Sequence, residues 1–84
     1  MPELCRFDGI KISIHSNDHD PPHIHARYGE HRIKVALNPV EVKGGYFPTR
    51  KRRQLMDWVR KRNAELNHAW ENLQNSQPVD RIDP

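Results

Sequence analysis

The sequence predicts an α+β fold, in which a small antiparallel sheet of three to four strands carries one long C-terminal helix packed on its apolar face. Three observations support this fold class. Segments between residues 10 and 38 alternate apolar and polar side chains with a period of two, which is typical of half-buried strands. From Thr49 the apolar residues recur at intervals of three or four, as on one face of a helix. The 84 residues make one small domain, residues 1–84.

The predicted sheet extends over about residues 6–48. Its strands are expected at residues 10–16, 23–29, 31–38 and 40–48. In the first of them, Ile10, Ile12 and Ile14 alternate with polar residues. Turn formers and a double proline at residues 17–22 end that strand, because proline cannot donate to a strand ladder.

One helix is predicted over about residues 49–75, followed by a short tail at residues 76–84. Thr49 is a suitable N-cap residue. The apolar stripe of the helix consists of Leu55, Val59, Leu66, Trp70 and Leu73. This stripe has a gap at Arg62 and Asn63. Trp58 flanks the stripe and is expected at the edge of the core, and the alternative is a half-exposed ring that would suit a protein interface. The tail is either a short edge strand or unpaired.

The alternation divides the strand residues between two faces of the sheet. The face that the helix covers carries Ile10, Ile12, Ile14, Ile24, Ala26, Tyr28, Ile33, Val35 and Leu37. The opposite face carries Lys11, His15, His23, His25, Arg27, Arg32 and Lys34. Since no aspartate or glutamate lies in the interior of these strands, this second face is predicted to be cationic and rich in histidine.

His23 and His25 are two residues apart on a predicted strand, so their Cα atoms lie about 6–7 Å apart on one face. Two chemistries are open to such a pair. Neutral imidazoles can bind one metal ion, with a third ligand from His15, His19 or Asp18. Alternatively, one imidazole acts as a general base and the other as a general acid. The simplest alternative is a solvated strand face without chemistry.

The catalytic interpretation gives each residue of the cluster a role. His23 and His25 form the acid–base pair, and Arg27 holds a phosphate and stabilises charge in the transition state. Asp18 and His19 orient the imidazoles. This chemistry needs no cofactor. The metal interpretation instead predicts zinc or another divalent metal on the candidate ligands His15, His19, His23 and His25.

A run of basic residues begins the predicted helix, namely Arg50, Lys51, Arg52 and Arg53. Cations in the first turn oppose the helix dipole, at a cost of about 0.3–1 kcal/mol each at low salt. Their presence therefore favours a binding role over helix stability. Together with Arg32 and Lys34 of the sheet, they are the predicted contacts for nucleic acid or for a protein partner. A solvated charged face is the alternative.

Composition limits the setting in which the protein works. The chain has 14 Lys and Arg against 11 Asp and Glu, a net charge of +3, which permits an anionic partner without requiring nucleic acid. Cys5 is the single cysteine, so an intrachain disulfide is excluded. No segment resembles a signal peptide or the roughly 20 apolar residues of a membrane span. We expect a cytoplasmic protein with no membrane partner, and a core small enough to favour a homodimer.

Several segments resemble a bacterial family of domains of unknown function, DUF4160. They are RFDGIKI at residues 6–12, NDHDPPHIHARYGEH at 17–31, GYFPTRK at 45–51 and WVRKRNAELNHAW at 58–70. The most specific part is the string N-D-H-x-P-P-H-x-H-A, from Asn17 to Ala26. The resemblance covers nearly the whole chain. It implies a small neighbouring protein of the DUF2442 type and a type II toxin–antitoxin pair in which this chain is the toxin.

The predicted function is therefore a toxin component that binds a cognate antitoxin-like protein and acts on RNA or on the translation machinery. As an enzyme, it would be a metal-independent ribonuclease. One alternative is a non-catalytic module that binds metal, RNA or protein through the same face. A further alternative makes the chain the antitoxin half of the pair.

Overall fold

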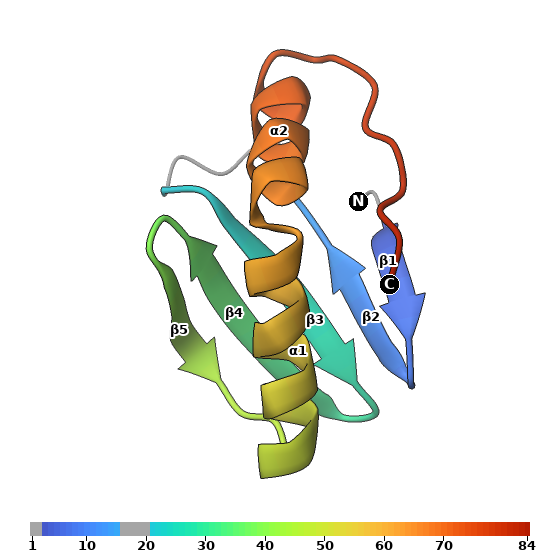
Figure 1. Cartoon of the computed structure of the whole chain (residues 1–84), viewed down its shortest axis with the longest axis vertical. Helices are drawn as coiled ribbons and strands as arrows, with labels where there is room; N and C mark the ends of the chain where they lie inside the picture. Colours follow the sequence, from blue (N-terminus) through green and yellow to red (C-terminus); the bar gives the residue numbers. More distant parts are fainter. Residues whose placement is uncertain (1–2, 16–20) are drawn as a thin grey trace.

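A computed structural model of the chain describes residues 3–15 and 21–84. It shows one antiparallel sheet of five strands in the order β1-β2-β3-β4-β5, with two helices on one of its faces (Figure 1). The α+β class is thus confirmed. The elements are β1 (Glu3–Phe7), β2 (Ile10–Ser13), β3 (His23–Tyr28), β4 (His31–Leu37), β5 (Val40–Gly45), α1 (Thr49–Lys61) and α2 (Asn63–Gln74).

The sheet has one strand more than the three to four that the sequence predicts. The four predicted strands are present as β2 to β5, and the additional strand is β1, which pairs with β2. Leu4 and Cys5 are neighbours in sequence and are both buried, so β1 lacks the period of two that identifies a strand. The register shifts between Glu3 and Cys5, and this irregularity lets both side chains reach the core.

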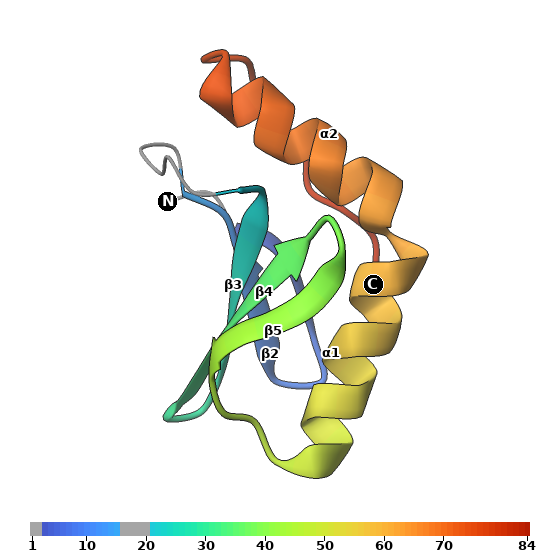
Figure 2. The same ribbon diagram turned by 90° about the vertical axis from the view of Figure 1, so that its left-hand side faces the viewer.

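The predicted long helix is wrong in one respect, because it is broken into α1 and α2 at Arg62, which has φ −104° and ψ 18°. The break falls at the gap in the apolar stripe. The side-chain amide of Asn63 donates to the carbonyl oxygen of Leu37 at 2.9 Å, which ties the first residue of α2 to the last residue of β4. As a result, α1 runs along the sheet face while α2 passes over its end (Figure 2).

The core lies between the helices and the sheet, as predicted. Of the fourteen residues predicted for the helix-covered face and the helix stripe, Tyr28 and Leu73 are partly buried. The other twelve are buried, namely Ile10, Ile12, Ile14, Ile24, Ala26, Ile33, Val35, Leu37, Leu55, Val59, Leu66 and Trp70. Phe47, which follows β5, is also buried and its ring lies 6.2 Å from that of Tyr28. Trp58 belongs to the core, as its predicted position at the core flank implies, and it is not half-exposed. Its side chain is buried, and its indole N–H donates to the carbonyl oxygen of Asp83 at 3.0 Å.

The C-terminal tail packs beside β1, where Figure 1 shows the end of the chain. The backbone N–H of Ile82 donates to the carbonyl oxygen of Leu4 at 2.8 Å, and the Ile82 side chain is buried. Arg81 forms an ion pair with Glu3 at 3.0 Å. Hydrogen bonds from Arg6 and then Arg81 hold the pKa of Glu3 below its usual value. The tail therefore covers part of the outer edge of β1.

The opposite edge of the sheet is formed by β5, which pairs only with β4. A register shift between Lys34 and Val35 disturbs this pairing. The exposed Lys43 projects from the strand and pairs with Glu41 at 3.4 Å. In the part of the chain that the structure describes, no helix is both long and apolar enough to cross a membrane.

Candidate functional site

The face of the sheet that is not covered by α1 carries a line of basic side chains. In the strand register, Arg6 lies opposite Lys11, Lys11 opposite Arg27, and Arg27 opposite Arg32. Residues that face each other across antiparallel strands project from the same side of the sheet. Four cations on four adjacent strands therefore form one line, which we call the cationic row.

The cationic row has few acidic neighbours. Arg6 pairs with Glu3 at 2.8 Å. For Lys11, Arg27 and Arg32, no carboxylate within residues 3–15 and 21–84 lies at ion-pair distance. The guanidinium of Arg27 donates to the carbonyl oxygen of Gly29 at 3.2 Å, which holds the side chain over the end of β3. Like charges directly opposite each other destabilise a sheet, so the row is not explained by stability.

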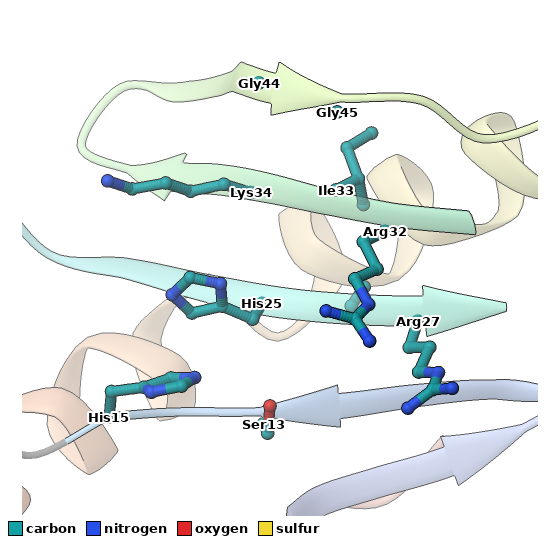
Figure 3. Close-up of a pocket in the computed structure, with 10 residues that line it drawn as sticks. Ser13, His15, His25, Arg27, Arg32, Ile33, Lys34, Gly44 and Gly45 are labelled. Carbon is teal, nitrogen blue, oxygen red and sulfur yellow. The ribbon is translucent and has the colours of Figure 1, made fainter. Parts of the chain in front are cut away.

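A second line of residues runs beside the cationic row. Ser13, His25 and Lys34 face one another across β2, β3 and β4, and the partner of Lys34 on β5 is Gly44. Figure 3 shows these side chains with His15, Arg27 and Arg32 around a shallow hollow of about 420 Å³. The residues of β5 that line this hollow are Gly44 and Gly45, which have no side chains.

Among residues 3–15 and 21–84, His15 and His25 form the closest pair of imidazoles on this face. Their ring centroids are 4.1 Å apart and the rings are tilted by 57°. His25 lies within β3, whereas His15 follows the end of β2, and in Figure 3 the two rings lie side by side. Both side chains are half-buried, so solvent and a ligand can reach them. The geometry therefore places the accessible histidine pair at positions 15 and 25.

Alternation assigns His23 to the open face beside His25, but its side chain is buried there rather than exposed. Only 1% of its surface is exposed. Its ring centroid lies 5.0 Å from that of Trp70 and 5.1 Å from that of His25. The Nδ1–H of His23 donates to the carbonyl oxygen of Pro21 at 2.9 Å, because a carbonyl can only accept.

The burial of His23 has a structural cause. It is the first residue of β3, at the end of the sheet over which α2 passes (Figure 2). Trp70 of α2 closes this end, so a residue that alternation assigns to the open face is enclosed here. His23 therefore supports the position of His25 from within, and we expect its main effect to be on stability.

Replacing His23 with alanine should lower the free energy of unfolding by about 2–3 kcal/mol, because it leaves a cavity against Trp70 and removes the hydrogen bond to Pro21. Urea unfolding followed by tryptophan fluorescence measures this change. His68→Ala is the matched control, since His68 is exposed on α2 and should change stability by no more than about 0.5 kcal/mol. Equal stability of the two variants would show that the buried position of His23 is wrong.

The remaining predictions for the histidine cluster concern Asp18, His19 and a bound metal ion. Asp18 and His19 lie outside the described residues, so their predicted roles are neither supported nor opposed. Within residues 3–15 and 21–84, no group of three or more His, Cys, Asp or Glu side chains is arranged to hold a metal ion. Of the metal candidates, His15, His23 and His25 come together through ring contacts.

The basic run that begins α1 lies apart from the cationic row. Helix α1 packs on the opposite face of the sheet (Figure 2), and its residues Arg50, Arg52 and Arg53 are exposed. The fold thus separates the predicted binding residues into two surfaces.

Lys51 differs from its neighbours, because it is engaged within the fold. Its ammonium group donates to the carbonyl oxygen of Asp8 at 2.8 Å and lies 4.9 Å above the Tyr28 ring. This residue therefore joins the first turn of α1 to the turn after β1 and to the end of β3.

Two residues of the face were not among the sequence-predicted site residues. Lys11 was assigned to this face by alternation, but its alignment with Arg27 becomes visible only in the register. Arg6 was missed because β1 was not predicted. The signal that could have found Arg6 is its position in the segment RFDGIKI, where Asp8 and Gly9 form a two-residue turn between strands.

Comparisons with known proteins identify the family of the chain. No curated protein matches it, and no solved structure matches it. The sequence profile of the Domain of unknown function (DUF4160) matches residues 9–71. This range includes β2 to β5, α1, most of α2, and both members of the histidine pair. Because the match covers well over half of the sequence, the chain belongs to the DUF4160 family.

Proposed function

We propose that this protein binds RNA through the open face of its sheet, and that it acts on RNA as the toxin component of a type II toxin–antitoxin pair. The observation that carries the proposal is the cationic row, in which Arg6, Lys11, Arg27 and Arg32 stand opposite one another on four adjacent strands. Adjacent strands are about 4.8 Å apart, so the row extends over about 14 Å. A line of charge of this length matches a chain of phosphates better than a single anion.

The histidine pair favours RNA over DNA as the polyanion. RNA carries a 2′-hydroxyl beside each phosphodiester, so the nucleophile for cleavage is already part of the substrate. One imidazole, of His15 or His25, removes the 2′-hydroxyl proton while that oxygen forms a bond to phosphorus. The bond between phosphorus and the 5′-oxygen breaks, and the other residue, as an imidazolium, protonates the leaving oxygen. Arg27 and Lys34, which line the same hollow, stabilise the charge that develops on the phosphate.

This reaction needs no further component. The RNA supplies the nucleophile, the two histidines supply the base and the acid, and Arg27 and Lys34 supply the positive charge. We therefore propose that cleavage requires no metal ion. We also propose that a cognate small protein is the partner that neutralises the toxin. Arg50, Arg52 and Arg53 are its proposed contact, since they are exposed and belong to α1, which packs on the other face of the sheet.

One observation favours a second function, in which the same face binds RNA without cleaving it. The centroids of the His15 and His25 rings are 4.1 Å apart, which leaves no space for a phosphate group between them. Cleavage thus requires the two rings to separate when RNA binds. If they do not separate, the pair supplies only hydrogen bonds and charge to the bound phosphate.

The cationic row makes a specific prediction about salt dependence. Replacing Lys11, Arg27 and Arg32 together with glutamine should remove three phosphate contacts. The slope of log affinity against log salt for single-stranded RNA should then become shallower by about 2. Fluorescence anisotropy across a salt series measures this slope.

The matched control replaces Arg50, Arg52 and Arg53 with glutamine, which removes the same net charge from the other side of the molecule. This variant should keep the parental slope. If the slope becomes shallower by the same amount in both triple variants, RNA binding depends on the net charge of the protein and the sheet face is not its site. A parent protein that binds no RNA at low salt would exclude the RNA-binding function.

A further inference from the structure

We propose that Gly44 is a specificity-determining residue of the open face, because its missing side chain leaves the place where an unpaired base of the bound RNA lies against the backbone of β5. This inference rests on the RNA-binding function proposed above, and it adds that the substrate is single-stranded.

Gly44 differs from the other glycines because the fold does not require it. The other three have positive φ values, a conformation that residues with a side chain rarely adopt. At Gly45, where φ is +87°, a Cβ atom would also collide with the carbonyl oxygen of Arg32. Gly44 has no positive φ, and within residues 3–15 and 21–84 no atom lies within 4 Å of the place that its Cβ atom would take. A side chain at Gly44 would therefore be neither strained nor in collision with the described residues.

Glycine is also unfavourable at this position. Within a strand it loses more conformational freedom on folding than other residues do, and it has no side chain to pack. The register shift between β4 and β5 does not explain Gly44, because a bulge requires glycine only where φ is positive. Glycine is also found in strands where a ligand approaches the backbone closely. Since stability does not explain Gly44, its presence indicates such a ligand.

Gly44 lies at the correct place for a ligand of the histidine pair. It is exposed on β5 opposite Lys34, and Lys34 is opposite His25 on the open face. Adjacent strands are about 4.8 Å apart, so Gly44 lies about 10 Å from His25, with β4 between them (Figure 3). A phosphate bound at the histidine pair therefore has its neighbouring nucleoside within reach of Gly44.

The charges around the hollow show which part of RNA fits Gly44. The charged residues that line the hollow, Arg27, Arg32 and Lys34, all belong to β3 and β4, where they attract phosphates. The lining that β5 supplies is the uncharged backbone of its two glycines, which suits a flat and uncharged base. In a duplex the bases are stacked inside the helix and cannot lie against a protein backbone. The RNA that uses Gly44 is therefore single-stranded.

The stability of glycine variants tests whether the fold needs Gly44. Gly44→Ala and Gly44→Val should fold and should raise the urea concentration at the unfolding midpoint, because both residues restrict the unfolded chain and valine favours strands. Gly45→Ala is the matched control. It should lower the midpoint, since its Cβ atom would collide with the backbone of Arg32. A lower midpoint for Gly44→Ala would show that this glycine is structural and would overturn the inference.

Binding is then measured by fluorescence anisotropy with two probes of equal length. One is a short 2′-O-methyl oligouridine, which cannot be cleaved through its 2′-oxygen, and the other is an abasic oligomer, which has a sugar–phosphate backbone but no bases. The parent should bind the oligouridine more tightly. Gly44→Val should weaken binding of the oligouridine by about 10-fold, the scale of the contact of one base, and should leave affinity for the abasic oligomer unchanged. Gly44→Ala should have a smaller effect in the same direction.

The other outcomes are distinct from one another. Parental affinity of Gly44→Val for the oligouridine would show that no base lies at Gly44, while RNA binding by the cationic row would stand. Equal weakening for both probes would show that valine obstructs the RNA backbone rather than a base, which also contradicts the inference. Equal affinity of the parent for both probes would show that the open face contacts no base. Absence of binding by the parent to either probe would remove the proposed function as well.

Discussion

Replacing Phe47 with alanine should lower the free energy of unfolding by about 3–5 kcal/mol, the range observed when a buried phenylalanine is truncated. The side chain is 1% exposed and packs near Tyr28, between the end of the sheet and the start of α1. Small domains are stable by only about 5–15 kcal/mol, so this variant should lose much of its stability. Urea unfolding monitored by the fluorescence of the buried Trp58 and Trp70 measures the change.

Tyr46→Ala is the matched control for this prediction, because the two aromatic residues are adjacent and only one is buried. It should leave the free energy of unfolding within about 0.5 kcal/mol of the parent. The packing of this end of the molecule would be wrong if Phe47→Ala were as stable as Tyr46→Ala.

Changing both His15 and His25 to glutamine should reduce RNA cleavage by about 10²–10⁴-fold, the range that general acid–base catalysis supplies. Glutamine keeps a polar side chain of similar reach but cannot exchange protons near neutral pH. Affinity for uncleavable RNA should change far less than the cleavage rate. In cells, expression of the parent should inhibit growth, co-expression of the cognate partner should relieve that inhibition, and the double variant should be harmless at equal expression.

His68→Gln supplies the control for a histidine outside the site, and it should retain both cleavage and growth inhibition. Cleavage by the parent should also persist in the presence of a chelator, because no step uses a metal ion. Loss of binding in parallel with cleavage in the double variant would favour the non-catalytic function. Full growth inhibition by the double variant would exclude the pair as catalytic residues.

Much of the fold could be predicted because the strands of the sheet centre have one buried and one open face. Ile10, Ile12 and Ile14 show the period of two that follows from this arrangement. The edge strand β1 could not be predicted in this way, since Leu4 and Cys5 are both buried next to a register shift and show no period of two. The helix break was visible only as a gap in the stripe, because a short interruption does not by itself distinguish a kink from a polar turn.

The site was predicted less well, for a reason that His23 makes clear. Alternation assigns a side chain to a face of the sheet, but it does not say what lies beyond the end of a strand. At the start of β3 that neighbour is Trp70, which is 47 positions later in the sequence and reaches His23 only because α2 turns over the end of the sheet. His25, one pleat further along, remains open and meets His15. The cationic row needs the register of four strands, which no single segment contains.

The two edges of the sheet are shielded by different means, and this affects how copies of the protein behave together. At β1 the tail occupies part of the edge through Ile82, whereas β5 carries a register shift and the charged Lys43. A long, regular, uncovered strand edge is the usual starting point for amyloid-like aggregation, because it offers a template of unpaired backbone groups. Neither edge offers such a template over its full length. The sheet can thus present one face to a ligand at high concentration without promoting growth of fibrils along its strands.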